Sequence, residues 1–586
     1  MNRPKGIFAW AKRHNCTFGV DKFQLLDLTK KLIPHQFNPR RRIPVPRRAL
    51  ILGEQRIPSK ETAKFLGVTV DNKLSWKAHC ATALAKGQDW LIQFGRLART
   101  TQGVNAKYIR QLYLAIAIPR MLYAADVFLT PQQNIGNPKR NNRNGRTIIN
   151  KLASIQCQAA IMITGAMKST ATDVLEVMAN LIPFHLLVDK TRQRAALRLA
   201  TLPPSHPLHK PILNAASRLV KRHPTPLHDL MHRYKIQPKL IETIKATRHD
   251  IKWKPNITIK IAGNADDTIK ELENDNPDIK VFTDGSGMDN KIGAAAVLYR
   301  NGRQKSKLRY QLGPQRYHTV YEGEGVGTIL GTKLVSKEWG ARSVIFYIDN
   351  LAIIMATQLT KPTSGHHIID TLHRYIATLK ARNHDLTVTF KWIPGHKGVE
   401  GNESADTQAK KSITEGSSNT TILPAQLKDP LPYSKSTTKC AYNGKLQQKA
   451  QRAWEKSPRF ERMKDIEPTA PSKTYIKLIA NLPRRLASTL TQLRTGHAPL
   501  AKHLHRIKKE DSPICPACLQ RPETVQHLLL HCPAHWKARQ ALRNNTGGRN
   551  IDIKKLLTTP NTLKYVFKFI TDTGRFHHLK TITLPN

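Results

Sequence analysis

The sequence predicts an α/β domain near the middle of the chain, with a mixed five-stranded sheet and flanking helices. Short apolar runs suited to strands alternate there with longer segments that have helical spacing, and an acidic residue lies at the end of two of the runs. The expected strands are 279–283, 292–299, 305–312, 343–349 and 386–393, and the expected helices are 320–338, 350–358, 366–380 and 400–412.

Each strand of this block has its own pattern. The first two, IKVFT at 279–283 and IGAAAVLY at 292–299, are apolar runs typical of buried strands. The third, KSKLRYQL at 305–312, alternates polar and apolar residues, as a strand with one exposed face does. The fourth, SVIFYID at 343–349, comes after the helix predicted at 320–338. This order of strands and helices favours one mixed sheet.

The rest of the chain has a different character. Helical periodicity dominates residues 5–200, and segments rich in Pro, Asn and Arg interrupt it at 131–146 and near 203–278. A chain of 586 residues is too long for one hydrophobic core. The expected regions are a mainly helical N-terminal region at 1–130, a helical connector at 131–277, the α/β domain at 278–412, a linker at 413–439, a basic helical region at 440–508, a Cys/His segment at 509–545 and a C-terminal tail at 546–586.

The charge of the chain indicates a polyanionic partner. It has 95 Lys and Arg against 41 Asp and Glu, a formal net charge of +54, and residues 1–60 alone hold 14 basic and 3 acidic residues. We expect a nucleic-acid surface here, with a solvated basic arm or a localisation signal as the alternatives. An anionic membrane is a weaker candidate, because no apolar run approaches the roughly 18 residues of a membrane span and no signal-peptide pattern is seen. We expect an intracellular protein, with the nucleus as one candidate compartment. The basic cluster comprises Arg40, Arg41, Arg42, Arg47 and Arg48.

Four acidic residues of the central domain form a candidate metal site. Asp284 and Asp349 each end a predicted strand, Glu324 lies in the first turn of the helix between them, and Asp406 lies on the last helix. Taken singly, a strand-end Asp is often a turn residue, and an early helical Glu often complements the helix dipole. Taken together, such carboxylates repel one another unless cations neutralise them. Two Mg²⁺ or Mn²⁺ ions would do so, and a metal pair about 4 Å apart can hydrolyse a phosphodiester.

The sequence around these acids resembles a known family. The segments VFTDGSG (281–287), EGEGVG (322–327), YIDN (347–350) and WIPGHKGVEGNESAD (392–406) are similar, in order and spacing, to the four acid-bearing motifs of type 1 ribonuclease H. The resemblance implies a ribonuclease H-like fold. It also implies cleavage of the RNA strand of an RNA/DNA hybrid with two divalent metal ions.

The resemblance also assigns roles to individual residues. Asp284, Glu324, Asp349 and Asp406 correspond to the metal-binding catalytic acids. His396, on a loop flanked by glycines, matches the mobile histidine that assists proton transfer and product release in this family. On residue type alone, a single histidine on such a loop is more often an ordinary surface residue.

The flanks resemble part of another enzyme. Residues 8–26, 64–79, 113–128 and 156–187 are similar to the late palm, the thumb and the following segment of reverse transcriptases from non-LTR, LINE-like retrotransposons. The polymerase motif of an aromatic residue followed by Ala-Asp-Asp does not occur in residues 1–100. We therefore expect a truncated reverse transcriptase polyprotein without DNA polymerase activity.

Three of the seven cysteines fall in a spacing typical of a zinc site. Cys515, Cys518, His527 and Cys532 offer three thiolates and one imidazole, enough for a closed tetrahedral Zn²⁺ site. His531 is a competing ligand, and unrelated reduced thiols are the alternative reading. The cluster resembles the CCHC knuckle that follows the nuclease in these retroelements. We expect the other cysteines to be reduced thiols: Cys16, Cys80, Cys157 and Cys440.

These observations leave several hypotheses about function. The first is a ribonuclease for RNA/DNA hybrids that also binds other nucleic acid and needs no small-molecule cofactor. The second is a catalytically inactive nucleic-acid-binding remnant, whose helix at 320–338 contains too many glycines to position Glu324. A structural or assembly protein is the third. The sequence predicts no oligomeric state.

Overall fold

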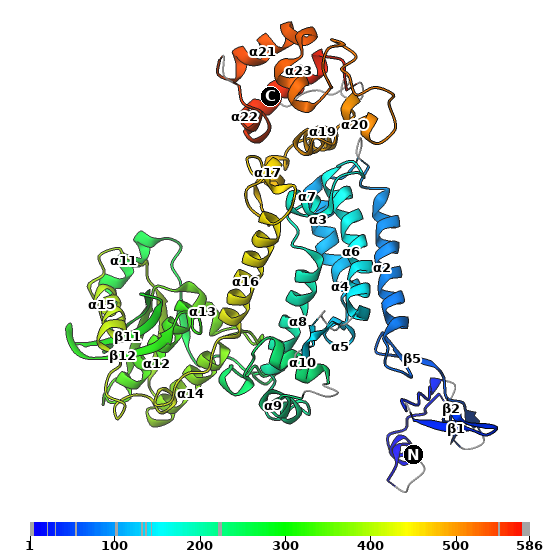
Figure 1. The fold of residues 1–586 in the computed structure, drawn as a ribbon. Coiled ribbons are helices and arrows are strands. Elements are labelled where there is room, and N and C mark those ends of the chain that lie inside the picture. Colours follow the sequence, from blue (N-terminus) through cyan, green and yellow to red (C-terminus); the bar gives the residue numbers. More distant parts are fainter. Residues whose placement is uncertain are drawn as a thin grey trace. The chain divides into compact units, whose positions relative to one another are not determined.

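A computed structural model describes most of the chain (Figure 1). The chain divides into two compact units. Unit 1 comprises residues 1–134, 139–191 and 447–586, and unit 2 comprises residues 135–138 and 192–446. The boundary after residue 191 falls within helix α8 (Phe184–Ala200), and the boundary after residue 446 falls within helix α16 (Lys435–Glu455). The described residues are 5–19, 22–29, 31–52, 55–99, 103–129, 133–134, 137–141, 143–220, 225–548 and 551–576.

The N-terminal region is less helical than predicted. After α1 (Ile7–Arg13), the described residues up to Asp71 form short strands in two-stranded pairs. The helical prediction for this stretch is wrong. Prolines such as Pro34 and Pro39, which lack the N–H that a helix interior needs, favour extended backbone there. The strands are β1 (Leu32–His35), β2 (Asn38–Pro44), β3 (Leu50–Leu52), β4 (Gln55–Ile57), β5 (Thr62–Phe65) and β6 (Val68–Asp71).

Helices build the rest of unit 1, and they come from both ends of the chain. Trp90 and Tyr113 belong to the same hydrophobic core as Tyr475 and Phe567. The segment after residue 447 therefore completes the core that the N-terminal helices begin. The helices are α2 (Lys77–Gly95), α3 (Ala106–Leu112), α4 (Ile118–Met121), α5 (Ala125–Phe128), α6 (Arg143–Thr164), α7 (Thr172–Met178), α17 (Phe460–Met463), α18 (Thr474–Leu478), α19 (Arg484–Thr495), α20 (Ala501–Arg506), α21 (Trp536–Thr546), α22 (Ile553–Thr558) and α23 (Pro560–Asp572).

Unit 2 contains a six-stranded mixed sheet in the order β12-β11-β10-β13-β14-β9. The five predicted strands are all present, but the predicted strand number is wrong because β9 pairs in parallel with β14. A strand of three residues carries too short a pattern to be recognised in the sequence. The strands are β9 (Thr258–Lys260), β10 (Ile279–Met288), β11 (Lys291–Arg300), β12 (Arg303–Pro314), β13 (Ser343–Ile348) and β14 (Thr387–Trp392).

Helices cover both faces of this sheet (Figure 1). Successive side chains of a strand point to opposite faces, and accordingly Val281 and Phe282 of β10 belong to different core clusters. The larger cluster lies under α12, α13 and α14, and the smaller one includes Ala405 of α15. No helix of the described residues is long and apolar enough to cross a membrane. The helices named here are α12 (Val320–Val335), α13 (Leu351–Ala356), α14 (His366–Arg382) and α15 (Glu400–Glu415), and α9 (His209–Ser217), α10 (Pro226–Arg233) and α11 (Ala265–Asn274) precede them.

Candidate active site

Three of the four predicted acids meet at one edge of the sheet. Strands β10 and β13 are parallel neighbours in which Thr283 pairs with Ile348, and the next residue of each chain segment is an acid, Asp284 and Asp349. Glu324 reaches the same place from the second turn of α12. One ligand oxygen from each of the three carboxylates lies within 4.8 Å of the others. We call these three residues the acid triad.

Glycines allow α12 to pack directly on the sheet. A Cβ atom placed on Gly285 of β10 would lie 2.2 Å from the backbone nitrogen of Glu324, so no larger residue fits there. Gly327 of α12 approaches β10 in the same way, because a Cβ atom added to it would lie 3.1 Å from the carbonyl oxygen of Asp284. Thr319 and Glu322 form a reciprocal capping box at the start of the helix. The helix is thus continuous over its 16 residues, although glycines weaken isolated helices.

The surroundings of the triad penalise negative charge. Burial, followed by the charges of Asp284 and Asp349, raises the pKa of Glu324 to about 10. Burial, followed by the charges of Asp349 and Asp406, raises the pKa of Asp284 to about 7. Burial also raises the pKa of Asp349. Among the described residues, Oδ2 of Asp284 and Oε2 of Glu324 are buried and lack a hydrogen-bond partner. Hard divalent cations fit such a set of oxygen donors.

Side-chain amides and an indole hold the triad in place. The Asn402 side chain donates to Asp349, and the Asn350 side chain to Glu324, so each favours the ionised carboxylate. The Asn350 carbonyl oxygen also caps α13, and Trp392 Nε1 donates to the backbone oxygen of Asp349 at 3.0 Å. The sequence interpretation gave these residues no role. Their positions inside the acid-bearing motifs were the signal that could have identified them.

Asp406 and His396 border the triad without joining it. The Asp406 carboxylate accepts a hydrogen bond from Lys410 Nζ at 2.6 Å. Its charge still raises the pKa of both Asp284 and Asp349. His396 is exposed on a loop with a positive φ of 55°, and its charge lowers the pKa of Asp349. All five predicted residues of this site therefore lie in one neighbourhood, and three of them are close enough to one another to bind the same metal ion.

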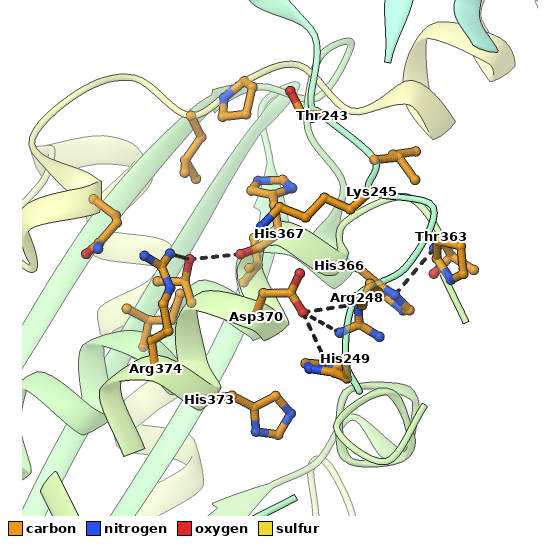
Figure 2. A pocket seen from close by; sticks show the side chains of 18 of the residues that line it. Thr243, Lys245, Arg248, His249, Thr363, His366, His367, Asp370, His373 and Arg374 are labelled. Atoms are coloured by element: carbon orange, nitrogen blue, oxygen red, sulfur yellow. Dashed lines mark hydrogen bonds and ion pairs between the residues drawn. The ribbon is translucent and has the colours of Figure 1, made fainter. Parts of the chain in front are cut away.

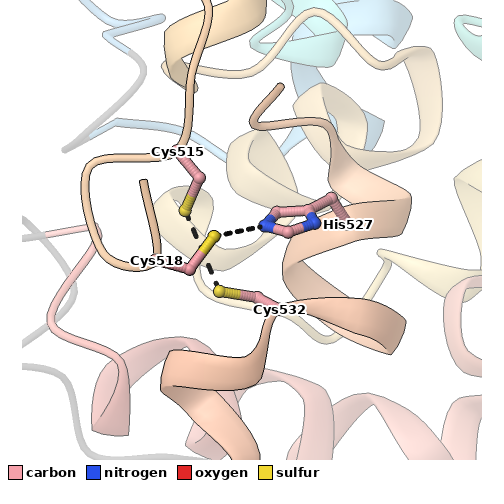
Figure 3. Close-up of side chains that lie close together, drawn as sticks. All are labelled: Cys515, Cys518, His527 and Cys532. Carbon is pink, nitrogen blue, oxygen red and sulfur yellow. Dashed lines mark hydrogen bonds between the residues drawn. The ribbon is translucent and has the colours of Figure 1, made fainter. Parts of the chain in front are cut away.

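The predicted zinc ligands also come together, in unit 1 (Figure 3). Cys515 Sγ lies 3.8 Å from Cys532 Sγ, and Cys518 Sγ lies 3.4 Å from His527 Nε2. One ligand atom from each of the four residues lies within 4.8 Å of the others. His531, the competing ligand, is exposed and outside this group. Three soft sulfur ligands and one imidazole suit Zn²⁺ in tetrahedral geometry.

The Cys/His cluster is integrated into the core of unit 1. Leu528 and Leu529, which follow His527, are fully buried and belong to the large hydrophobic core. The buried Arg539 donates hydrogen bonds to the backbone oxygens of Leu529 and Cys532. The cluster therefore does not stand alone as a small knuckle.

The N-terminal arginines are available to a ligand. Arg40, Arg41 and Arg42 lie on β2 and are exposed, and Arg48 is also exposed. Arg47 differs, because it forms an ion pair with Asp27 at 3.2 Å.

Comparisons with known proteins place this geometry in context. Residues 276–414 match the family model for RNase H. The chain is similar to the N-terminal RNase H domain of a Mycobacterium tuberculosis protein (16% identity, TM-score 0.20, covering 24% of this chain and 96% of that chain). It is similar to LC11 RNase H1, solved with an RNA/DNA hybrid (17% identity, TM-score 0.19, covering 23% of this chain and 99% of that chain). It is also similar to the prototype foamy virus protease-reverse transcriptase (20% identity, TM-score 0.19, covering 24% of this chain and 21% of that chain).

The comparison with curated protein sequences gives no match. The match to the family model covers every strand of the sheet except β9, and it includes all four predicted acids and His396. The chain therefore carries an RNase H domain at residues 276–414.

Proposed function

We propose that the RNase H domain hydrolyses the RNA strand of an RNA/DNA hybrid, with divalent metal ions held by the acid triad. The arrangement of the triad carries this proposal. Its three carboxylates are within ligand distance of one another, and two of their buried oxygens have no hydrogen-bond partner among the described residues. Burying several carboxylates together is costly unless cations neutralise them.

The residues of the chain have distinct tasks in this proposal. Asp284, Glu324 and Asp349 would hold the metal ions, which supply a Lewis acid and an activated water beside the scissile phosphate. The hydrogen bond from Asn402 favours the ionised form of the Asp349 carboxylate and partly offsets the effect of burial on its pKa. His396, on its exposed loop, would donate a proton to the leaving oxygen and assist the release of the product. Asp406 adds negative charge at the edge of the site.

Binding of the hybrid rests on charge and shape. A formal net charge of +54 favours a polyanion. Selection of a hybrid would depend on contacts to the 2′-OH groups of one strand and to the deoxyribose of the other. The exposed arginines of β2 are candidates for sequence-independent phosphate contacts.

The substrate is tested with the full chain and three labelled nucleic acids: an RNA/DNA hybrid, duplex DNA and single-stranded RNA. In Mg²⁺ or Mn²⁺ the hybrid alone should be cut, in its RNA strand, and EDTA should stop the reaction. Equal cutting of single-stranded RNA would contradict the proposal. Tight binding of the hybrid without cleavage in either metal would favour the inactive binding remnant instead.

We also propose that Cys515, Cys518, His527 and Cys532 hold a structural Zn²⁺ ion. The support is the tetrad of ligand atoms and its place in the core of unit 1. We further infer from the resemblance of residues 8–26 and 64–79 that the flanks derive from a LINE-like reverse transcriptase. Primer extension by this chain on an RNA template should stay at background.

A further inference from the structure

Unit 2 contains a cavity whose lining includes no residue of the acid triad, and Figure 2 shows side chains of this lining. Its volume is about 690 Å³, within the range of small-ligand pockets. One wall is α14, and the facing wall is the segment 243–253, which precedes the RNase H domain. Ile329 of α12 and Leu431 add apolar surface. We call this cavity the connector pocket.

Positive charge dominates the lining of the connector pocket. Its permanently charged groups are Lys245, Arg248 and Arg374 against the single carboxylate of Asp370. Arg248 binds Asp370 through two nitrogens, at 2.6 and 3.0 Å. Lys245 and Arg374 are exposed, and neither forms an ion pair within the described parts of the chain. The pocket therefore has two cations left for an anionic ligand.

Flat rings form another part of the lining. His249 and Trp253 stack with centroids 3.7 Å apart and an interplanar angle of 7°, and His373 meets Trp253 edge-on at 5.0 Å. Burial lowers the pKa of His249, and it lowers the pKa of His373 to about 4. Both histidines therefore favour the neutral form. They present ring surface and nitrogen atoms to a ligand rather than charge.

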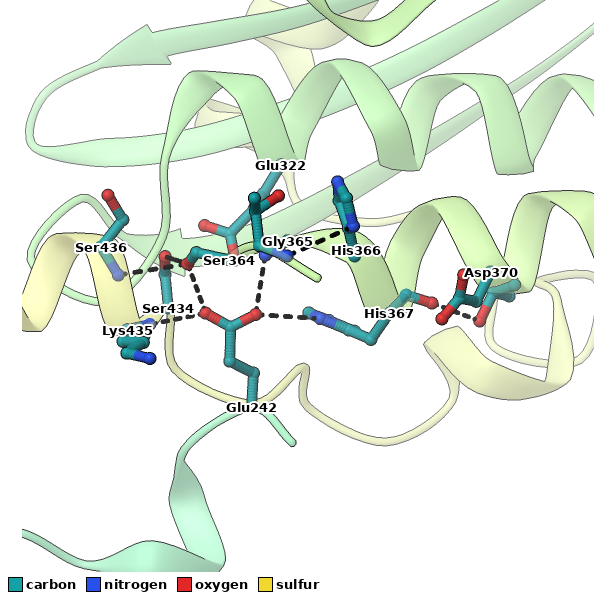
Figure 4. Close-up of polar contacts among 12 residues, drawn as sticks. Glu242, Glu322, Ser364, Gly365, His366, His367, Asp370, Ser434, Lys435 and Ser436 are labelled. Atoms are coloured by element: carbon teal, nitrogen blue, oxygen red, sulfur yellow. Dashed lines mark hydrogen bonds and ion pairs between the residues drawn. The ribbon is translucent and has the colours of Figure 1, made fainter. Parts of the chain in front are cut away.

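The segment 243–253, which forms the wall of the connector pocket that faces α14, is anchored by one buried carboxylate (Figure 4). Glu242, directly before this wall, accepts hydrogen bonds from the backbone nitrogens of Gly365 and Lys435, both at 2.7 Å. It also accepts one from the Ser364 hydroxyl, and His367 Nδ1 lies 3.4 Å away. Farther along the wall, Arg248 donates to the backbone oxygen of Leu359. These contacts fix the connector against the start of α14.

The chemistry of the lining identifies the class of ligand. Two cations without an ion-pair partner among the described residues favour a negative group, and stacked rings beside apolar side chains favour a planar ring. A nucleotide within a nucleic-acid strand has a negative phosphate and a planar base. Ile329 of the pocket and Glu324 of the triad both lie on α12, about 7.5 Å apart along the helix axis and about 140° apart around it. The pocket and the triad therefore lie on different faces of the same helix.

We propose that the connector pocket binds one nucleotide of the nucleic-acid strand that enters or leaves the acid triad. Lys245 and Arg374 contact its phosphate, and its base lies against the rings of His249 and Trp253. The proposal rests on the proposed function only in taking a nucleic acid as the substrate. It assigns substrate binding to a segment outside the RNase H domain.

The test uses the full chain with Asp284→Asn, so that the hybrid stays intact. The variant Lys245→Ala/Arg374→Ala is compared with Arg303→Ala/Lys307→Ala, a control that removes one exposed arginine and one exposed lysine of β12. Hybrid affinity is measured by fluorescence anisotropy over a range of salt. Hybrids with 4-thiouridine or 4-thiothymidine in one strand are then photo-crosslinked, and the modified residues are mapped by mass spectrometry.

The pocket variant should bind the hybrid more weakly, with the slope of log K against log salt reduced by about 0.7 to 0.9, as expected when one phosphate is no longer neutralised. Crosslinks should map to 249–253 or His373 and disappear in the pocket variant alone. Equal slopes in the two variants, or crosslinks only elsewhere, would refute the proposal. If AMP binds to the pocket and the hybrid crosslinks elsewhere, the proposal is also refuted, because the ligand of the pocket would then be a free nucleotide. Cleavage by the wild-type protein is measured separately, so failure of the proposed function is distinguishable.

Discussion

The acid triad and the Cys/His cluster are both candidate metal sites, but their surroundings differ. The cluster offers four ligands of the kind that close a tetrahedral zinc site, and Cys515 and Cys532 are fully buried in the core of unit 1. The triad offers three carboxylates at a sheet edge, with a fourth acid and an exposed histidine beside them. A closed set of ligands suits a structural ion, whereas an incomplete set leaves room for substrate and water. The difference implies that metal loss should affect stability at one site and chemistry at the other.

The largest expected effect on stability is the loss of zinc from the Cys/His cluster. In the full chain, Cys532→Ser should abolish stoichiometric zinc and lower the stability of unit 1 by about 4 kcal/mol, the contribution of a ligand at a thousand times its Kd. Zinc is measured by elemental analysis of the reduced protein and stability by calorimetry. Cys440→Ser is the control, because Cys440 is exposed and outside the cluster. Unchanged zinc content in Cys532→Ser would refute the zinc site.

The next effect concerns the contact between β10 and α12. Gly285→Ala should lower the rate of hybrid cleavage by at least about 10²-fold, because the added Cβ collides with the backbone of Glu324 and a 1 Å displacement of a catalytic group costs that much. Gly263→Ala is a matched control, since a Cβ there would meet no atom of the described residues within 4 Å. Rates are compared at saturating Mg²⁺. Full activity of Gly285→Ala would show that the position of α12 is not critical.

The raised pKa values predict how the triad responds to pH. Metal ions bind the ionised carboxylates, so Mg²⁺ affinity should rise as pH increases through about 7, the pKa of Asp284, and binding should release protons. Without metal, the folded-state pKa values of Asp284 and Glu324 lie above their unfolded values. Their contribution to stability is therefore complete at low pH and is lost as pH rises toward 7 and 10.

Calorimetry across this pH range checks the sign of the effect. The melting temperature of unit 2 in EDTA should fall as pH increases from 5 to 8, and Mg²⁺ should offset the fall. The Cys/His cluster should show no such response to Mg²⁺. A metal-free unit 2 that becomes more stable with rising pH would contradict the assigned burial of these acids.

The smallest expected effect is that of His396. His396→Ala should slow cleavage by about tenfold, less than the 10²-fold or more typical of a general acid or base, because the side chain is exposed and the metal ligands remain. His384→Ala, an exposed histidine of the same domain, is the control. A loss of cleavage rate as large as that expected for replacing a triad residue would show that His396 is essential for catalysis.

The sequence predicted that four acids meet at one site, and three of them lie within ligand distance of one another. Two of these three directly follow parallel strands whose register places Thr283 beside Ile348. The sequence also predicted the Cys/His cluster with His527 as its imidazole, and His531, the competing ligand, lies outside the group. Both predictions depend on spacing within short segments. The glycines of α12 were interpreted as a weakness, whereas Gly327 lets the helix backbone approach β10.

Features that depend on distant residues could not be predicted. Glu242 contacts Lys435, which lies 193 residues later, and nothing in the local pattern around either residue indicates that contact. The same holds for the core of unit 1, where Trp90 and Phe567 come from opposite ends of the chain. Strand β9 was not predicted, because its three residues gain their conformation only by pairing with β14. Tertiary packing, rather than local propensity, decides such elements.

One measurement tests the central claim most directly: cleavage of an RNA-labelled hybrid by wild type and by Asp284→Asn in Mg²⁺ and in Mn²⁺, with hybrid affinity measured in parallel. Asn preserves the shape of the side chain and removes the charge that a metal ion needs. We expect the wild-type protein to cut the RNA strand, and the variant to cut it on the order of 10⁴-fold more slowly while binding the hybrid equally well. Equal cleavage by the two proteins would show that the acid triad is not the active site.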